Sequence, residues 1–160
     1  YIELVLKRLN DGKPIFLLAH SMGALVQTLG LLERPQENFT AQILSAPLFG
    51  VAVAVPGYKK HAAEWLSKVM LTRYPDIMRE FDKDPLRHNR LSSGVYLGFT
   101  KAFTEVMNRA SEIKVPTLFM CPEKDPVVDT QTTLLLRDKW GTDQVQALIY
   151  GDGARHEMIN

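Results

Sequence analysis

Residues 15–24, Ile-Phe-Leu-Leu-Ala-His-Ser-Met-Gly-Ala, contain the transition that decides the fold. The apolar run 15–19 is too short for a helix and is flanked by helix-breaking residues, which is typical of a strand covered on both faces. From Met22 the apolar side chains recur at helical spacing as far as Leu32, shortly before a proline. The stretch therefore predicts a strand, a tight turn at Ser21 and a helix.

The same alternation of short apolar runs and helical spacing continues along the chain. Further strands are predicted at 41–45, 115–121 and 145–150, and further helices at 2–9 and 130–140. In the last helix, the residues expected on the buried side are Leu134, Leu135 and Leu136. Strands that alternate with helices predict an α/β fold, with a mostly parallel sheet and helices on both of its faces.

A segment of about 48–111 interrupts this alternation, because it is much longer than the crossover between two parallel strands requires. It is predicted to be an insertion into a single domain that covers residues 1–160. Within it, residues 51–56 are expected to form an apolar loop or short strand, and helices are expected at 61–72 and 94–109. The buried side of the second helix is expected to consist of Val95, Phe99, Phe103 and Val106.

The composition is that of a soluble globular domain and argues against several classes of function. Of the 160 residues, 46% are hydrophobic and 23% charged, and 19 Lys and Arg against 18 Asp and Glu give a net charge of +1. This balance, without a basic tract, disfavours nucleic-acid binding. The longest apolar run, 48–56, is too short to span a bilayer. The single cysteine, Cys121, is expected to be a buried strand residue, and we expect neither a metal site nor a cofactor.

A serine at a strand-to-helix turn is a candidate nucleophile. Such a turn exposes the Ser21 hydroxyl at the carboxyl end of the sheet and requires small residues two positions before and after it, here Ala19 and Gly23. The next helix begins at once, so its free N–H groups and the positive end of its dipole point at the serine. The backbone N–H of Met22 is the natural donor to an oxyanion. Together with Ser21, the residues Ala19, His20 and Gly23 form the predicted nucleophile turn.

A serine hydroxyl needs a general base, and the chain has four histidines that could supply it. His20 lies inside the turn, without reach to the hydroxyl of its neighbour, and His61 and His88 lie in the insertion. His156 follows the strand predicted at 145–150 through a glycine-containing loop, at the edge of the sheet where a catalytic base is required. His156 is therefore the candidate base, and the alternative is that it is an exposed loop residue.

The carboxylate that orients the base is expected at the same edge. Asp125 follows the strand predicted at 115–121 by a short turn and is the first candidate. Asp129 is the alternative, although it would serve equally as the N-terminal residue of the next helix. The chain order Ser21, Asp125, His156, with each residue after a predicted strand, matches the order of an α/β-hydrolase triad.

On these residues the chain resembles the α/β-hydrolase superfamily, and within it the monoacylglycerol lipase and lysophospholipase group. The segment from Ala19 to Ala24 is similar to that group's Gly-His-Ser-Met-Gly-Gly motif. The similarity extends to the segments 43–49, 115–118, 125–129 and 153–158, and it spans nearly the whole chain.

The resemblance implies Ser21 as nucleophile, His156 as general base and acid, and Asp125 as the partner that orients His156. It also implies that residues 48–111 form a cap over an acyl-binding pocket. Where the family usually has glycine, this chain has Ala19, Ala24 and Pro122. With proline in place of glycine, the geometry of the turn that presents Asp125 does not follow from the resemblance.

The family's domain begins with further strands, one of which leads into a loop that carries a second oxyanion donor. Nothing before Tyr1 supplies these strands, and the chain stops shortly after His156, where the family continues into a helix. We therefore expect the C-terminal part of a longer hydrolase, in which the outer edge of the strand 15–19 is unpaired. By itself this part is expected to be poorly soluble and to have little activity.

The expected activity is that of a serine hydrolase that cleaves carboxylic esters through an acyl-enzyme on Ser21. The apolar residues of the insertion favour lipid monoesters, such as monoacylglycerols or lysophospholipids, over charged or sugar esters. The expected partner is a small-molecule ester and not a nucleic acid. We expect a cytoplasmic location, with transient contact of the cap with a membrane surface. The alternatives are a short-chain esterase or peptidase of the same fold, and a non-catalytic binding protein with an α/β-hydrolase fold.

Overall fold

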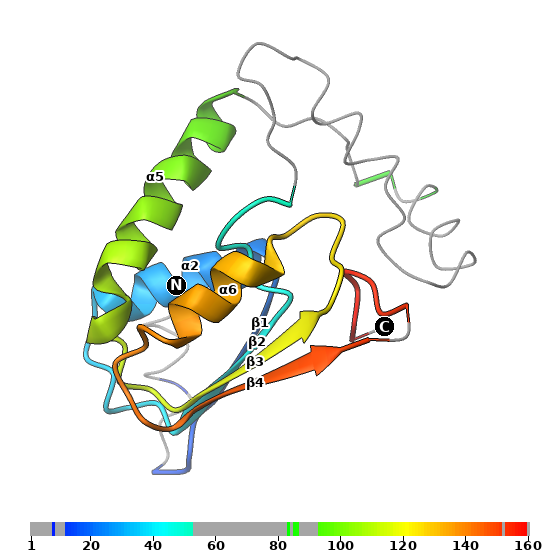
Figure 1. Cartoon of the computed structure of the whole chain (residues 1–160). Helices are drawn as coiled ribbons and strands as arrows, with labels where there is room; N and C mark the ends of the chain where they lie inside the picture. Colours follow the sequence, from blue (N-terminus) through cyan, green and yellow to red (C-terminus); the bar gives the residue numbers. More distant parts are fainter. Residues whose placement is uncertain are drawn as a thin grey trace.

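A computed structural model describes most of the chain (Figure 1). The described residues are Arg8, 12–52, Lys83, 85–86, 93–151 and 153–159. Several predicted features lie outside them: the helix 2–9 apart from Arg8, the apolar residues 53–56, the helix 61–72, and the histidines His61 and His88.

Four parallel strands form one sheet with the spatial order β1-β2-β3-β4. They are β1 (Phe16–His20), β2 (Ala41–Ser45), β3 (Thr117–Pro122) and β4 (Val145–Tyr150). All four predicted strands are confirmed, and β2 and β4 have the predicted bounds. Because parallel strands run in the same direction, their carboxyl ends share one edge of the sheet, where Figure 1 also shows the C-terminal segment.

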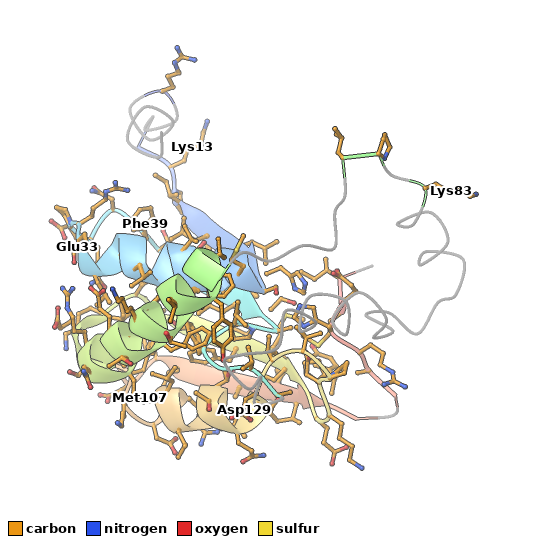
Figure 2. The ribbon with its side chains drawn as sticks, turned by 90° about the horizontal axis from the view of Figure 1, so that it is seen from above. Lys13, Glu33, Phe39, Lys83, Met107 and Asp129 are labelled. Atoms are coloured by element: carbon orange, nitrogen blue, oxygen red, sulfur yellow. The ribbon has the colours of Figure 1, made fainter. Side chains whose placement is uncertain are left out.

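In the part of the chain that the structure describes, three α-helices lie on one face of the sheet (Figure 1). They are α2 (Met22–Leu32), α5 (Ser93–Arg109), which continues into the 3-10 helix η1 (Ala110–Glu112), and α6 (Thr130–Arg137). Helix α6 contacts β3 and β4, whereas α5 packs on α2. Viewed from above, α5 and α2 lie side by side, with Glu33 at the end of α2 (Figure 2). These three predicted helices are confirmed.

The core lies between the sheet and these helices. Its largest fully buried side chains come from both layers and include Leu25, Leu44, Phe49, Val106, Ile113, Phe119 and Leu136. Burying a large apolar side chain in this way contributes about 1.5–3 kcal/mol. Val106 is 0% exposed, so the last turns of α5 belong to the core of the domain although they lie within the predicted insertion.

Two side chains that the helical pattern assigns to the core are exposed instead. Val95 is exposed because it lies in the first turn of α5, before Phe99, where the contacts of this helix with the core begin. Leu135 is exposed because α6 directs Leu136 toward the sheet. Adjacent helix positions differ by about 100° in direction, so Leu135 and Leu136 cannot both face the core.

The other face of the sheet carries apolar side chains that no described segment covers. Phe16 and Leu18 of β1 are 68% and 62% exposed, and Ile43 of β2 and Leu148 of β4 are also exposed. The strand at 15–19 was expected to be covered on both faces. Within the described residues it is covered on one, because the three described helices all pack on the opposite face.

A buried hydrogen-bond network joins the sheet to the helical layer. Gln42 Nε2 donates to Thr117 Oγ1 over 2.9 Å, and Trp140 Nε1 donates to the same oxygen over 2.8 Å. The Thr117 hydroxyl donates in turn to the carbonyl of Val115, and Gln27 of α2 donates to Gln42 Oε1. Every polar group of this network therefore has a partner, which buried polar atoms require.

Cys121 is buried in β3, where the sequence predicted it. Burial raises the pKa of its thiol from the ordinary value of 9.0 to about 12, and the Asp125 carboxylate nearby acts in the same direction. The thiol is therefore protonated and unreactive in the folded protein, because the thiolate is the nucleophilic form.

We expect Cys121 to resist iodoacetamide in the folded protein at neutral pH and to react readily in concentrated urea. Because unfolding restores the ordinary pKa, the raised pKa contributes stability that is complete below pH 9.0 and is lost as the pH rises toward about 12. Mass spectrometry of protein alkylated across a urea series measures the first effect, and urea unfolding at several alkaline pH values measures the second. Rapid alkylation without urea would contradict the assigned burial.

Gly141 and Gly30 differ in the space that surrounds them. A Cβ atom at Gly141 would lie 2.0 Å from the Ser111 carbonyl oxygen, whereas a Cβ atom at Gly30 in α2 would meet nothing within 4 Å. We expect Gly141→Ala to lower the free energy of unfolding by about 1–3 kcal/mol, because the backbone must move. We expect Gly30→Ala to raise it by about 0.5–1 kcal/mol, through helix propensity. Urea unfolding measures both, and equal effects of the same sign would refute the assignment.

Candidate active site

The carboxyl ends of β1, β3 and β4 bring three polar side chains together. Ser21 follows β1 directly, Asp125 lies in the turn after β3, and His156 lies in the loop after β4. His156 Nε2 lies 2.8 Å from Ser21 Oγ, and His156 Nδ1 lies 2.9 Å from Asp125 Oδ2. The three residues that the sequence predicted as a site thus form one hydrogen-bonded chain.

Ser21 has a backbone conformation that an L-residue rarely adopts. Its φ of 52° is in the left-handed region, which costs about 1–3 kcal/mol and requires support from the surroundings. Two backbone hydrogen bonds provide this support: the Ser21 N–H donates to the Ser45 carbonyl over 2.9 Å, and the Leu48 N–H donates to the Ser21 carbonyl over 3.0 Å. The segment that follows β2 therefore holds the turn from both sides.

The side chain of Ser21 faces His156 and does not cap the helix that follows. Serine before a helix usually accepts a hydrogen bond from the first turn, but Ser21 makes no such bond to α2. The N–H groups of Met22 and Gly23 belong to the first turn, where a helix offers no internal acceptor. These donors and the positive end of the α2 dipole therefore follow Ser21 directly at the start of the helix.

The two small residues of the turn face each other. A Cβ atom at Gly23 would lie 3.9 Å from the Cβ of Ala19, which is itself buried. Because this is an ordinary contact distance, an alanine fits at position 19, and the need for a residue as small as glycine at position 23 stays a prediction. Pro122, which also stands where the family usually has glycine, is the last residue of β3. Its carbonyl accepts a hydrogen bond from Thr130 Oγ1 over 2.8 Å. With proline at this position, Asp125 still reaches His156.

Asp125 is fully buried, and its own loop compensates for the loss of water. The side chain is 0% exposed and that of His156 is 4% exposed. Asp125 Oδ1 accepts hydrogen bonds from the N–H groups of Val127 and Val128, over 2.7 and 3.0 Å, while Oδ2 faces His156. A buried carboxylate requires partners of this kind. The Asp-Pro pair at 125–126 is a signal for such a turn, and the sequence reasoning missed it.

Asp129, the alternative acid, has a different partner. It precedes α6, where Figure 2 labels it, and its side chain accepts hydrogen bonds from the Gln131 N–H and the Thr132 hydroxyl. These are the contacts of a helix N-cap. The structure brings Asp125, and not Asp129, to His156.

His20 makes contacts that the sequence analysis did not foresee. Its ring centroid lies 4.9 Å from that of His156, its Nδ1 lies 3.3 Å from Ser45 Oγ, and its Nε2 lies 3.5 Å from Glu157 Oε2. No local pattern could have revealed these contacts, because they join segments that are distant in the sequence. Consistent with the prediction, His20 is not the residue that faces the Ser21 hydroxyl.

A small apolar cluster adjoins the three polar residues. Its buried members are Ala46, Leu48 and Val128, and half-buried side chains packed against them include Phe99 and Met158. Val51, at the start of the predicted insertion, also joins this cluster and forms an antiparallel bridge with Val128. The beginning of the segment predicted to be an insertion is thus paired with the loop that presents Asp125.

Among the residues that the structure describes, no three His, Cys, Asp or Glu side chains gather to bind a metal ion. In the same part of the chain, no helix has both the length and the apolar character that a bilayer crossing requires.

Sequence comparison relates the whole chain to hydrolases. Residues 2–160 match the family described as serine aminopeptidase, S33. The chain is 27% identical to a monoglyceride lipase homolog of Monkeypox virus, over 97% of this chain and 59% of that protein. It is also 27% identical to phospholipase YtpA of Bacillus subtilis, over 92% of this chain and 62% of that protein. The chain therefore spans about three-fifths of the length of these curated relatives.

Solved structures show the same fold. The crystal structure of a monoacylglycerol lipase from Paleococcus ferrophilus matches with a TM-score of 0.79 at 22% identity, covering 98% of this chain and 64% of that one. A soluble variant of the monoglyceride lipase of Saccharomyces cerevisiae, in complex with a substrate analog, matches with a TM-score of 0.78 at 18% identity, covering 98% and 59%. At these identities the likeness shows the fold alone, which is that of the α/β-hydrolases.

Proposed function

The chain belongs to the serine aminopeptidase (S33) family of α/β-hydrolases, and from this membership and the geometry of the site we propose that it is a serine hydrolase of carboxylic esters. The proposed substrates are lipid monoesters, such as monoacylglycerols or lysophospholipids. The observation that carries the proposal is the hydrogen-bonded chain from Ser21 through His156 to Asp125.

The proposed reaction has two steps. Ser21 Oγ attacks the ester carbonyl while His156 Nε2, 2.8 Å away, accepts the hydroxyl proton. The oxyanion that forms is stabilised by the Met22 N–H, and His156 returns the proton to the departing alcohol. Water then attacks the acyl-enzyme, with His156 again accepting the proton, and the acid product leaves as Ser21 regains its proton. Asp125 orients His156 and stabilises its charged form throughout.

Two observations support lipid monoesters as the substrate class. The curated relatives at 27% identity carry the names monoglyceride lipase homolog and phospholipase. The half-buried apolar side chains that pack on the cluster of Leu48 and Val128, among them Phe99 and Met158, are the groups that an acyl chain would contact. We further propose that residues 48–111 act as a cap over that chain, with transient contact with a membrane surface.

Two other functions are the alternatives to an ester hydrolase: a peptidase and a binding protein without catalysis. The family's description as serine aminopeptidase supports a peptidase that uses the same three residues on an amide bond. A binding protein without catalysis would have no need for a strained serine in hydrogen-bond contact with a buried His–Asp pair.

The function is tested on the protein in its full natural length. We expect monoacylglycerols or lysophospholipids with long acyl chains to be hydrolysed faster than the corresponding acetate esters. Ser21→Ala removes the attacking oxygen and should lower kcat by about 10⁶-fold. A fluorophosphonate probe should form an adduct at Ser21, detected by peptide mass spectrometry, and none in the variant.

Other substrate preferences, or the absence of an adduct, would favour other functions. A preference for acetate would indicate a short-chain esterase, and cleavage of aminoacyl amides in place of esters would indicate a peptidase. The absence of both adduct and hydrolysis would leave the binding protein.

Asp125→Asn tests the role of the acid with little change in shape. The asparagine oxygen can still accept from the Val127 and Val128 N–H groups, but its NH₂ group would face His156 Nδ1 and impose the wrong tautomer. We expect kcat to fall by about 10⁴-fold, with the unfolding midpoint nearly unchanged.

The matched control is Asp129→Ala. It should lower stability by about 1 kcal/mol through the loss of the α6 N-cap and leave kcat close to that of the unmodified protein. If Asp129→Ala lowers kcat more than Asp125→Asn does, the assignment of the acid is wrong.

A further inference from the structure

His156 is held by two hydrogen bonds, one at each nitrogen of its ring. Both bonds are made by nitrogens of the ring, so together they define one axis, and rotation of the buried ring about that axis is limited only by what packs on its two faces. The residues around His156 on its loop, 153–159, form neither helix nor strand. A third contact, away from that axis, is therefore needed to fix the plane of the imidazole.

The ring of His20 makes such a contact. Its centroid lies 4.9 Å from that of His156, with the two planes tilted by 52°. The separation is within the range in which aromatic rings attract each other, and the tilt is intermediate between a stacked and an edge-to-face arrangement. His20 is also the last residue of β1 and is paired in register with Ser45, so its backbone is fixed by the sheet.

One polar group is hydrogen-bonded to the His20 ring, and a second lies close to it. On one side, Ser45 Oγ lies 3.3 Å from Nδ1, and Ser45 is fully buried in β2. On the other side, Glu157 Oε2 lies 3.5 Å from Nε2, a buried nitrogen without a hydrogen bond among the described residues. Because Glu157 directly follows His156, its contact with His20 joins the loop of the candidate base to β1.

We propose that His20 is a positioning residue for His156. Its ring, anchored by Ser45 and facing Glu157, fixes the plane of the His156 imidazole so that Nε2 stays directed at the Ser21 hydroxyl. This role rests on the proposed function of Ser21 and His156, but it is distinct from theirs, since His20 acts on the reacting atoms only through His156.

Three variants separate the ring of His20 from its polar atoms. His20→Phe keeps an aromatic ring against His156 and loses both nitrogens. His20→Asn retains a polar group near the position of Nδ1, within reach of Ser45, and loses the ring. His20→Ala removes both. The measurements are kcat and KM for ester hydrolysis, the rate of fluorophosphonate labelling per active site, and the urea unfolding midpoint.

We expect His20→Ala and His20→Asn to lower kcat and the labelling rate by about 10- to 100-fold, with KM nearly unchanged, because a small misplacement of a catalytic group has effects of this size. His20→Phe should recover most of the rate. The NMR signal of the proton between His156 and Asp125 should broaden or shift in the two variants without a ring and be retained in His20→Phe. A merely structural role would lower the unfolding midpoint without changing the rate per active site.

Leu18→Ala is the matched control, because it shortens a side chain two residues earlier on the same strand and the same face of the sheet. It should leave the rate per active site unchanged. Unchanged kcat in His20→Ala, or a His20→Phe variant as slow as His20→Ala, would overturn the positioning role. If the unmodified protein itself is not labelled at Ser21, the proposed function fails, and the NMR comparison still decides whether His20 orders His156.

Discussion

The hydrogen bond from the Ser21 N–H to the Ser45 carbonyl is the contact on which the candidate site depends. It extends the parallel pairing of β1 and β2 one step beyond the last paired residues, His20 and Ser45. A residue with a φ of 52° would relax in an unsupported loop, but here the sheet lies on one side of it and α2 begins on the other. The energy that maintains this conformation comes from the packing of the whole layer, in which Leu25 of α2 and Leu44 of β2 are fully buried.

Much of this arrangement could be predicted from local sequence. Apolar runs located the strands, and helical spacing located α2, because both patterns depend on backbone periodicity alone. The residues Ser21, Asp125 and His156 could be chosen because each follows a strand, and parallel strands end at one edge of the sheet. The choice between Asp125 and Asp129 stayed open in the sequence, since a carboxylate after a strand and an N-cap before a helix have the same local signature.

The contacts that could not be predicted are those between distant segments. Gln42 is a polar strand residue, yet it is buried because Thr117 and Trp140 supply its partners from elsewhere in the chain. Leu135 belongs to a continuous apolar run, and only the docking of α6 decides that its neighbour faces the core. His20 has a local position in the turn, but its neighbours come from two distant segments: Ser45 from β2, and His156 and Glu157 from the loop after β4.

The hydrogen bond between Ser21 and His156 joins residues that are 135 positions apart. Bringing such distant segments together has a high entropic cost, and it is offset only when the strands between them have paired. During synthesis the serine emerges from the ribosome long before its histidine partner. The nascent chain therefore carries an ordinary, inert hydroxyl, and the contact that would activate it forms only after β4 has been added to the sheet. Reactivity at Ser21 would thus report the completion of folding as directly as any spectroscopic probe.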